Sequence, residues 1–199
     1  MITTYKTITS STQAEFKDKG SRFIAFAYPI RTLADVNPLK EEHHKARHWC
    51  YAYRLGVDGM QFRANDDGEP SGSAGRPILG QIDSVGITDV LVVVVRYFGG
   101  TLLGVPGLIH AYKEATAQAL AVAEVVEKNI EKTVWLKCEY PFLNEAIRIA
   151  KQYQADVLER DLQLDCRLTV SLSLVNYEAC VAAWKSTRQI EVNTEKPFE

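Results

Sequence analysis

Apolar positions in the first half of the chain come in short, nearly continuous runs. Runs at residues 23–30, 48–55 and 90–96 predict strands, because a strand buried on both faces needs apolar side chains at successive positions. The run at 90–96 reads VLVVVVR. Residues 60–64 follow a Val-Asp-Gly turn at 57–59 and are expected to return as the hairpin partner of 48–55.

Helical periodicity is expected in three other stretches of the first half. Residues 33–46 follow Thr32, which can cap a helix, and Pro38 either kinks this helix or opens a second one after an asparagine cap. Residues 108–127 predict a long helix in which alanine recurs every four positions, so that one face can approach a sheet closely. Residues 78–83 have room for one or two helical turns.

The second half of the chain alternates regularly between strand and helix after a polar stretch at 127–132. Strands are expected at 133–139, 155–160, 164–174 and 189–194, and helices at 142–153 and 177–186. This βαββαβ order, over about 65 residues, is that of the ferredoxin-like split βαβ unit. We therefore expect an α+β protein with two domains, residues 1–130 and residues 131–199.

Composition and charge narrow the class of protein. The 199 residues include 23 Lys and Arg against 25 Asp and Glu, a net charge of −2, and proteins that coat nucleic acid non-specifically usually carry a basic excess instead. The first residues lack the apolar core of a signal peptide, and the longest apolar stretch, 90–95, is far too short to cross a bilayer. We expect a cytoplasmic protein that does not associate with membranes.

Two glycine-rich segments are candidates for binding an anion. Residues 65–77 read NDDGEPSGSAGRP, and residues 98–107 read FGGTLLGVPG directly before the long predicted helix. A helix N-terminus offers free N–H groups to an anion. The second segment nevertheless matches neither G-x-G-x-x-G nor the P-loop, because Val105 and Pro106 stand where the P-loop has Lys and Ser or Thr. Tight turns and close packing are the alternative explanation for these glycines.

Acidic and nucleophilic side chains suggest catalytic sites that the sequence does not complete. Asp66, Asp67 and Glu69 could hold a hard cation, but they lack EF-hand spacing and Asp-Gly is typical of a solvated turn. His48 and Cys50 share one strand face, yet residues two apart on a strand lie roughly 7 Å apart, too far for a direct hydrogen bond. The four cysteines fit neither a zinc site nor a disulfide framework and are expected to be buried thiols. We expect no catalytic residue, metal or cofactor.

Aromatic and basic residues offer a different kind of site. Arg47, Trp49, Tyr51 and Tyr53 alternate along a predicted strand, a pattern that suits either stacking on bases or an ordinary core with an arginine at its edge. The cations that could gather beside the glycine-rich segments are Arg47, Arg76, Arg96 and Lys113. If the fold brings them together, they form a modest patch for phosphate or an acidic partner.

Three segments together resemble the IMPACT/YigZ family: ARHWCYA at 46–52, DDGEPSGSAGRP at 66–77, and VRYFGGTLLG with the following Gly-Leu and Ala-Tyr pairs at 95–112. The resemblance implies a first domain with the ribosomal protein S5 domain 2-like fold. It also implies a ferredoxin-like second domain, like the extra domain of bacterial members. Both are similar to the last two domains, IV and V, of elongation factor G.

What the resemblance implies about function is regulation of translation. Eukaryotic relatives act under amino-acid starvation by binding a large activator of a translation-controlling kinase. They carry an RWD domain that this sequence lacks, so that partner is not carried over. We expect a non-enzymatic protein that binds RNA, the ribosome or a ribosome-associated partner.

Two alternatives stay open at this point. One is a small-ligand or nucleotide-binding enzyme, since small-molecule kinases share the S5-like fold, with residues 72–75 as the nearest candidate phosphate loop. The other is a protein–protein interaction module. The residues expected on the binding surface are Arg47, His48, Asp66, Asp67, Glu69, Gly72, Gly75, Arg76, Arg96, Tyr97, Gly99, Gly100, Gly104, Gly107 and Lys113.

Overall fold

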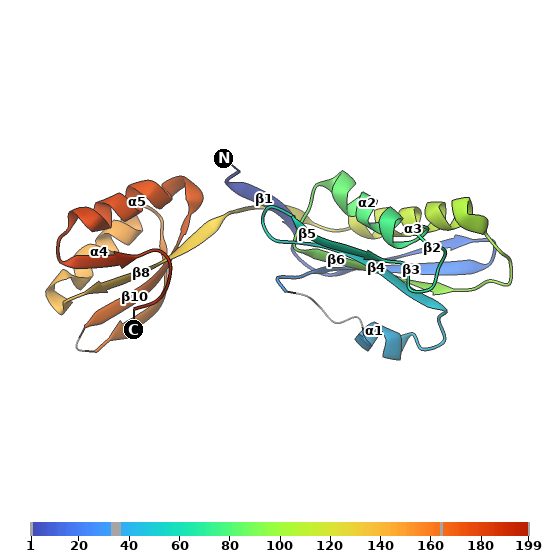
Figure 1. Cartoon of the computed structure of the whole chain (residues 1–199), viewed down its shortest axis with the longest axis horizontal. Helices are drawn as coiled ribbons and strands as arrows, with labels where there is room; N and C mark the ends of the chain where they lie inside the picture. Colours follow the sequence, from blue (N-terminus) through green and yellow to red (C-terminus); the bar gives the residue numbers. More distant parts are fainter. Residues whose placement is uncertain (1, 33–36, 164, 199) are drawn as a thin grey trace. The chain divides into compact units, whose positions relative to one another are not determined.

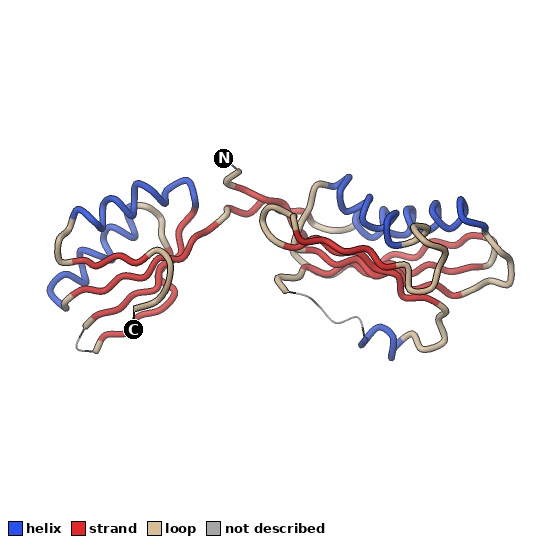
Figure 2. Tube along the Cα trace, viewed as in Figure 1, coloured by secondary structure: helices blue, strands red, loops and turns tan. Residues whose placement is uncertain are grey.

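A computed structural model describes residues 2–32, 37–163 and 165–198 (Figures 1 and 2). The chain divides into two compact units, each with its own sheet, core and helices. We call Tyr5–Lys128 the N-terminal domain, and Asn129–Glu199 with Met1–Thr4 the C-terminal domain. The expected mixed α+β class is confirmed. No helix among the described residues is long and apolar enough to cross a membrane.

A five-stranded antiparallel sheet frames the N-terminal domain, with the strand order β2-β3-β6-β4-β5. Its strands are β2 (Thr12–Asp18), β3 (Ser21–Pro29), β4 (His48–Leu55), β5 (Gln61–Asn65) and β6 (Val90–Tyr97). The central strand β6 is buried from Val90 to Arg96, as its continuous apolar run predicted. Its pairing with β4 sets His48 directly opposite Arg96.

Helices cover both faces of this sheet. Figure 2 shows α2 (Gly75–Val85) and α3 (Gly104–Ala121) on one face, and α1 (Asn37–Glu42) lies on the other. The predicted alanine stripe of α3 is confirmed, because Ala111, Ala115 and Ala119 are fully buried. Small side chains let the α3 backbone approach the sheet closely.

Several helix boundaries differ from the sequence predictions. Residues 33–36 of the first predicted helix lie outside the described residues, and α1 ends at Glu42, before the predicted end at residue 46. The helix α2 begins at Gly75, inside the predicted loop 65–77, and continues to Val85. The helix α3 begins four residues earlier than expected and ends at Ala121, not at residue 127.

A two-stranded sheet that the sequence analysis did not predict accounts for the shorter α3. Strand β1 (Thr4–Ile8) pairs with β7 (Val125–Asn129), the segment assigned above to the end of a helix. Two valines begin β7, and β-branched side chains favour an extended backbone.

The C-terminal domain shows the expected βαββαβ order. Its elements are β8 (Glu131–Cys138), α4 (Tyr140–Gln152), β9 (Asp156–Leu162), β10 (Cys166–Ser173), α5 (Leu174–Ser186) and β11 (Ile190–Asn193). The sheet is antiparallel with the order β11-β8-β10-β9. Trp184 is fully buried in its core, and its indole N–H donates to the carbonyl of Ala146 at 3.1 Å.

Candidate functional site

A cavity of about 440 Å³ opens on the N-terminal domain where both glycine-rich segments meet the start of α3. It is lined by Arg47, His48, Glu69, Pro70, Arg96, Phe98, Leu102, Leu103, Gly104, Val105 and Leu108. The charged and histidine side chains come from β4, the residue before it, β6 and the loop that precedes α2, whereas the apolar ones come mainly from the β6–α3 loop and the start of α3. The cavity therefore has a polar part and an apolar wall.

The register of the sheet creates the polar part. His48 pairs with Arg96 across β4 and β6, and the N–H of Arg47 donates to the carbonyl of Arg96 at 2.8 Å. Two arginines that are far apart in the sequence thus become immediate neighbours. Arg47 is exposed, whereas only 6% of Arg96 is exposed.

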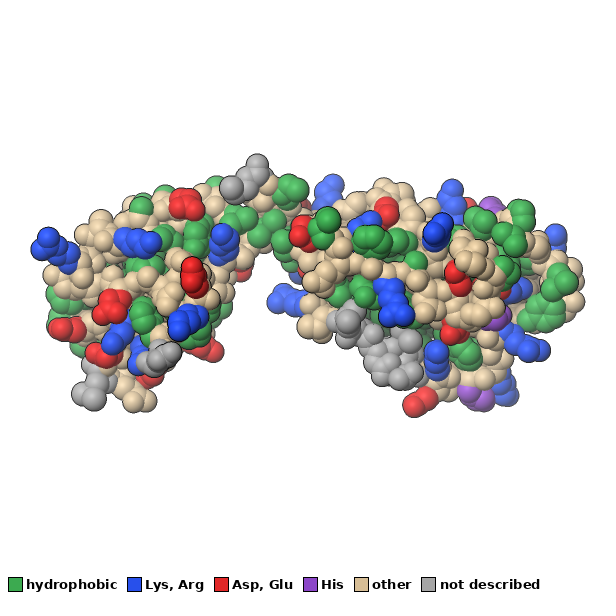
Figure 3. All heavy atoms as spheres, viewed as in Figure 1, with side chains coloured by type: hydrophobic (Ala, Val, Ile, Leu, Met, Phe, Trp, Pro, Cys, Tyr) green, Lys and Arg blue, Asp and Glu red, His purple; other side chains and the backbone are tan. Residues whose placement is uncertain are grey.

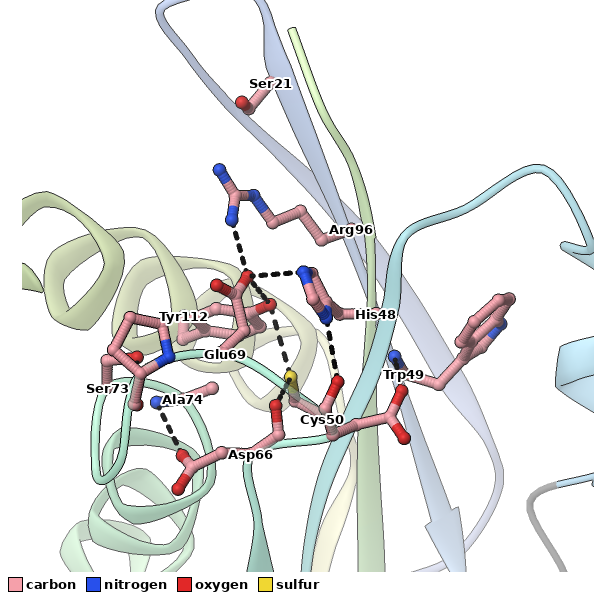
Figure 4. A network of polar contacts seen from close by, with 12 residues as sticks. Ser21, His48, Trp49, Cys50, Asp66, Glu69, Ser73, Ala74, Arg96 and Tyr112 are labelled. Carbon is pink, nitrogen blue, oxygen red and sulfur yellow. Dashed lines mark hydrogen bonds and ion pairs between the residues drawn. The ribbon is translucent and has the colours of Figure 1, made fainter. Parts of the chain in front are cut away.

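Glu69 gathers the buried polar groups around a single carboxylate oxygen (Figure 4). Its Oε1 accepts hydrogen bonds from Nη1 of Arg96 at 2.6 Å and from the hydroxyl of Tyr112 at 2.8 Å. The Nε2 of His48 lies 3.9 Å from the same oxygen. The Glu69 side chain is only 3% exposed, and burying a charge this deeply requires partners of this kind.

Arg96 retains unused hydrogen-bonding capacity. Its guanidinium lies over the rings of Phe23 and Phe98, at 5.5 and 5.8 Å from their centroids. The Nε is buried and has no hydrogen-bond partner among the described residues. A buried N–H without a partner is costly, and the planar donors of a guanidinium suit phosphate or carboxylate oxygens. Arg96 therefore borders the cavity with a guanidinium whose donors are not all used by Glu69.

His48 is oriented by the backbone of the acidic loop. Its Nδ1 lies 2.8 Å from the carbonyl oxygen of Asp67. A carbonyl only accepts, so we assign the proton of the neutral ring to Nδ1, which leaves Nε2 toward Glu69 and the cavity. Gly68, with φ of 86°, brings the loop close, because a Cβ there would lie 3.5 Å from Nδ1 of His48.

Asp66 does not line the cavity but holds the start of α2. Its carboxylate accepts hydrogen bonds from the backbone N–H groups of Gly72 at 2.9 Å, Ala74 at 3.0 Å and Gly75 at 2.8 Å. Partial burial raises the pKa of Asp66, but the three N–H donors outweigh it and hold the pKa below the ordinary value. The N–H groups of Ala74 and Gly75 stand at the N-terminus of α2, which Asp66 caps from up to nine residues upstream, and the N–H of Gly72 belongs to the preceding loop.

Asp67 also has a structural position. Its Oδ2 accepts a hydrogen bond from the backbone N–H of Trp49 at 2.8 Å, and its Oδ1 lies 3.5 Å from Nζ of Lys40. The carboxylates of Asp66 and Asp67 thus bind different backbone segments. Among the described residues, no group of His, Cys, Asp and Glu side chains is arranged to hold a metal ion.

Cys50 and His48 do not form a nucleophile–base pair. The Sγ of Cys50 lies 3.0 Å from the carbonyl oxygen of Asp66 and 3.3 Å from the hydroxyl of Tyr112. Burial raises the pKa of the Cys50 thiol and of the Tyr112 hydroxyl far above their usual ranges. A thiol that stays protonated is a poor nucleophile, so Cys50 belongs to the core.

The glycines of the second segment serve packing and turns more than the cavity. Gly99 passes so close to the β2–β3 turn that a Cβ would overlap the backbone of Gly20 and Ser21. Its N–H donates to Oγ of the fully buried Ser21 at 3.1 Å. Gly100 and Gly104 have φ of 87° and 71°, values that side chains rarely adopt. Of these glycines, only Gly104 borders the cavity.

The structure brings together some of the residues expected on a binding surface and separates the others. Arg47, His48, Glu69, Arg96 and Gly104 line one cavity. The expected residues outside its lining are Asp66, Asp67, Gly72, Gly75, Arg76, Tyr97, Gly99, Gly100, Gly107 and Lys113. The four cations therefore do not all converge, because only two of them reach the cavity.

The positions of three outlying residues have simple causes. Arg76 and Lys113 are exposed on α2 and α3. Tyr97 follows Arg96 on β6, so its side chain points to the opposite face of the sheet, where its hydroxyl lies 2.9 Å from Nδ1 of His43. The buried Nε2 of His43 has no hydrogen-bond partner among the described residues and lies 3.9 Å from Oε1 of Glu42, but it lies on that opposite face.

The apolar wall is the part that the sequence analysis missed. Phe98, Leu102 and Val105 are exposed at 43%, 84% and 46%, and Leu103 and Leu108 are buried behind them. The sequence signal that could have predicted this wall is the presence of large apolar side chains within the glycine-rich segment FGGTLLGV. An apolar side chain that a loop keeps in solvent often marks a binding site.

Charges of both signs are mixed on the face of the protein that is in view. Figure 3 shows Lys and Arg side chains interspersed with Asp and Glu over the visible face of each domain. This agrees with a net charge of −2. Positive charge at the cavity comes from Arg47, Arg96 and the start of α3, and among the described residues the N-cap residue of this helix, Leu103, makes no side-chain cap hydrogen bond.

Comparisons with known proteins identify relatives for both halves of the chain. An IMPACT family member from Haemophilus influenzae is 36% identical over 168 residues, 81% of each chain. YigZ from Escherichia coli, also named an IMPACT family member, is 38% identical over 141 residues, 70% of this chain and 69% of its own. The Protein IMPACT homolog of Saccharomyces cerevisiae is 33% identical over 96 residues, 44% of this chain and 36% of its own.

A solved structure shares the entire fold. It is described as the crystal structure of a hypothetical protein, with a TM-score of 0.76 and 29% identity, and the match covers 98% of this chain and 99% of that one. The family model of the Impact N-terminal domain matches residues 19–120, which include every residue that lines the cavity. This chain is a member of the IMPACT family.

Proposed function

We propose that this protein is a translation-associated regulator that binds RNA through the cavity of its N-terminal domain and acts without catalysis. The observation that carries the proposal is the convergence of Arg47 and Arg96 beside the start of α3. Arginines and helix N-termini are the groups that proteins use to contact the phosphates of nucleic acids. We propose the role in translation because the chain belongs to the IMPACT family.

The chemistry of the cavity favours binding over catalysis. Its lining contains no serine, threonine, cysteine or lysine side chain to act as a nucleophile, and the nearby Cys50 and Tyr112 are buried with raised pKa values. The alternative of a kinase-like phosphate loop at residues 72–75 is disfavoured as well. The backbone N–H groups of Gly72, Ala74 and Gly75 that would hold a phosphate already donate to Asp66.

Two arginines make a site for few phosphates. Each phosphate contact on single-stranded nucleic acid contributes a slope of about −0.7 to the dependence of log K on log salt. One or two contacts therefore predict a total slope between about −0.7 and −1.4. This is a local site, not the long basic groove of a protein that coats RNA.

The test is a salt series of binding to labelled single-stranded RNA and to ribosomes, followed by fluorescence anisotropy and by co-sedimentation. Arg47→Ala should weaken binding about tenfold and lower the salt slope by about 0.7, the share of one phosphate. Lys113→Ala is the matched control, because it removes an exposed cation of the same domain outside the cavity. Binding that is absent, independent of salt or equally sensitive to Lys113→Ala would refute the proposal.

A further inference from the structure

The size and lining of the cavity restrict what it can hold. At about 440 Å³ it lies near the lower end of small-molecule pockets, about 300–1,000 Å³. Its polar groups are Arg47 just before β4, His48 on β4, Arg96 on β6 and Glu69 in the acidic loop, whereas the β6–α3 loop and the start of α3 supply mainly apolar side chains. A suitable ligand has a compact anionic group joined to a flat, mainly apolar body.

The anionic part of that ligand is indicated by Arg96. Its side chain is 7% exposed and borders the cavity, and its buried Nε lacks a partner among the described residues. Glu69 takes only the Nη1 donor of this guanidinium. Because Nε is buried, an incoming phosphate would contact the exposed part of the guanidinium, with Arg47 at the rim and the N–H groups of Gly104 and Val105 at the start of α3.

The flat part is indicated by the apolar wall. Phe98, Leu102 and Val105 expose large side chains to solvent around the same cavity. A base stacks on an aromatic ring whatever its identity, since every base has a π-face. The Arg96 guanidinium lies 5.8 Å from the centroid of the Phe98 ring, so a base stacked on this ring would lie close to the arginine.

We infer that the cavity binds one nucleoside monophosphate unit, with the phosphate at Arg96 and Arg47 and the base against Phe98. The unit has the same chemistry whether it is an unstacked nucleotide of an RNA strand or a free mononucleotide. The inference deepens the proposed function in the first case and is independent of it in the second.

The experiment titrates AMP, GMP, CMP and UMP into the full-length ¹⁵N-labelled protein and follows NMR shifts. The backbone amides of Gly104 and Val105 and the side-chain Nε–H of Arg96 should move. Adenosine alone and inorganic phosphate alone should each bind at least tenfold more weakly than AMP, because each satisfies only one part of the cavity. Shifts confined to other parts of the chain would overturn the inference.

Paired variants separate stacking from folding. Phe98→Ala should weaken AMP binding at least fivefold, whereas Phe62→Ala, which removes another exposed ring, from β5 and outside the cavity lining, should leave it unchanged. Arg47→Ala probes the phosphate without disturbing the buried Arg96–Glu69 pair. Equal effects of Phe98→Ala and Phe62→Ala would contradict the assignment of the base to Phe98.

Binding of a short single-stranded RNA, with AMP as competitor, distinguishes the two sources. RNA that AMP displaces, and whose affinity Phe98→Ala lowers, supports both the inference and the proposed function. AMP binding without RNA binding supports the inference and refutes the proposed function. RNA binding that ignores AMP and Phe98→Ala refutes the inference and leaves the proposed function standing.

Discussion

The guanidinium of Arg96 is almost completely buried, and its positive charge is paired with a single carboxylate, that of Glu69. The Nη1 of Arg96 is 2.6 Å from Glu69 Oε1, and the two side chains are 7% and 3% exposed. A buried pair of this kind contributes little net stability, but the loss of one partner leaves the other charge buried and unpaired. Glu69 is thus a structural support for the arginine of the cavity.

Removing this carboxylate gives the first prediction. Glu69→Ala should lower the free energy of unfolding by about 3–5 kcal/mol, the usual cost of an orphaned buried charge, measured by urea denaturation. Glu15→Ala, which breaks the surface pair with Arg22, should cost much less, because exposed pairs are weak. An equal decrease in the free energy of unfolding for the two variants would show that losing a buried partner costs no more than losing an exposed one.

The second prediction concerns acid stability and Asp66. Its pKa is lowered in the folded protein, so the ionised form is stabilised by folding, and this stability is complete above the ordinary pKa and lost as the pH falls below about 4. Asp66→Asn should lower the free energy of unfolding by about 1–2 kcal/mol at pH 7. The difference in the free energy of unfolding between the variant and the wild type should decrease in acid, as measured by urea denaturation at a series of pH values. A difference that is independent of pH would contradict the prediction.

How far the site could be predicted differs from residue to residue. The candidates at 47, 48, 69 and 96 were identifiable as charged residues within distinctive segments, and they do meet. Their meeting depends on the pairing of β4 with β6, about fifty residues apart, which a single sequence does not reveal. Asp66 was assigned to a binding surface because its backbone partners, Gly72 to Gly75, were assigned to a loop.

At the scale of elements, strands with continuous apolar runs were predicted best. The strand β4 has the predicted bounds, His48–Leu55, and β6 extends one residue past its predicted end. Strands β1 and β2 were missed, because threonine and charged side chains occupy many of their positions. The start of α2 was missed because its cap lies outside the local sequence window.

A pair of glycine substitutions tests the close packing of the β6–α3 loop. Gly99→Ala should prevent stable folding or cost more than about 3 kcal/mol, because its Cβ would overlap the backbone of Gly20 and Ser21. Gly80→Ala is the control, since a Cβ in the middle of α2 meets nothing within 4 Å, and it should stabilise the protein by about 0.5–1 kcal/mol. Thermal and urea denaturation measure both, and a tolerated Gly99→Ala would show that the loop is not fixed there.

For the whole molecule, the structure shows separate hydrophobic cores in the two domains. Ile78, Val92 and Tyr112 lie in the core between the five-stranded sheet and its helices, and Leu136 and Trp184 lie in the core of the C-terminal domain. The fold class and the βαββαβ order were predictable because element periodicity is a local property. The shape and wall of the cavity were not, since they depend on side chains from distant segments.

The cysteines give a prediction for the two cores. Cys50 lies in the N-terminal domain, and the other three lie in the C-terminal domain. All are buried, and burial raises the pKa of Cys180 to about 12. Alkylation should therefore require unfolding, and mass spectrometry along a urea gradient should show Cys50 labelled at a different concentration from Cys138, Cys166 and Cys180. Rapid labelling in native buffer would contradict the buried positions.

The contact between Gly99 and the β2–β3 turn joins the cavity to the beginning of the chain. Gly20 lies in that turn, outside the glycine-rich segments and the other segments considered for binding. Its contact with Gly99 nevertheless positions the start of the β6–α3 loop, from which Phe98 and the rest of the apolar wall extend. Relatives that differ in this hairpin can therefore differ in ligand preference while keeping every cavity side chain identical. A search for specificity among them should begin at the hairpin.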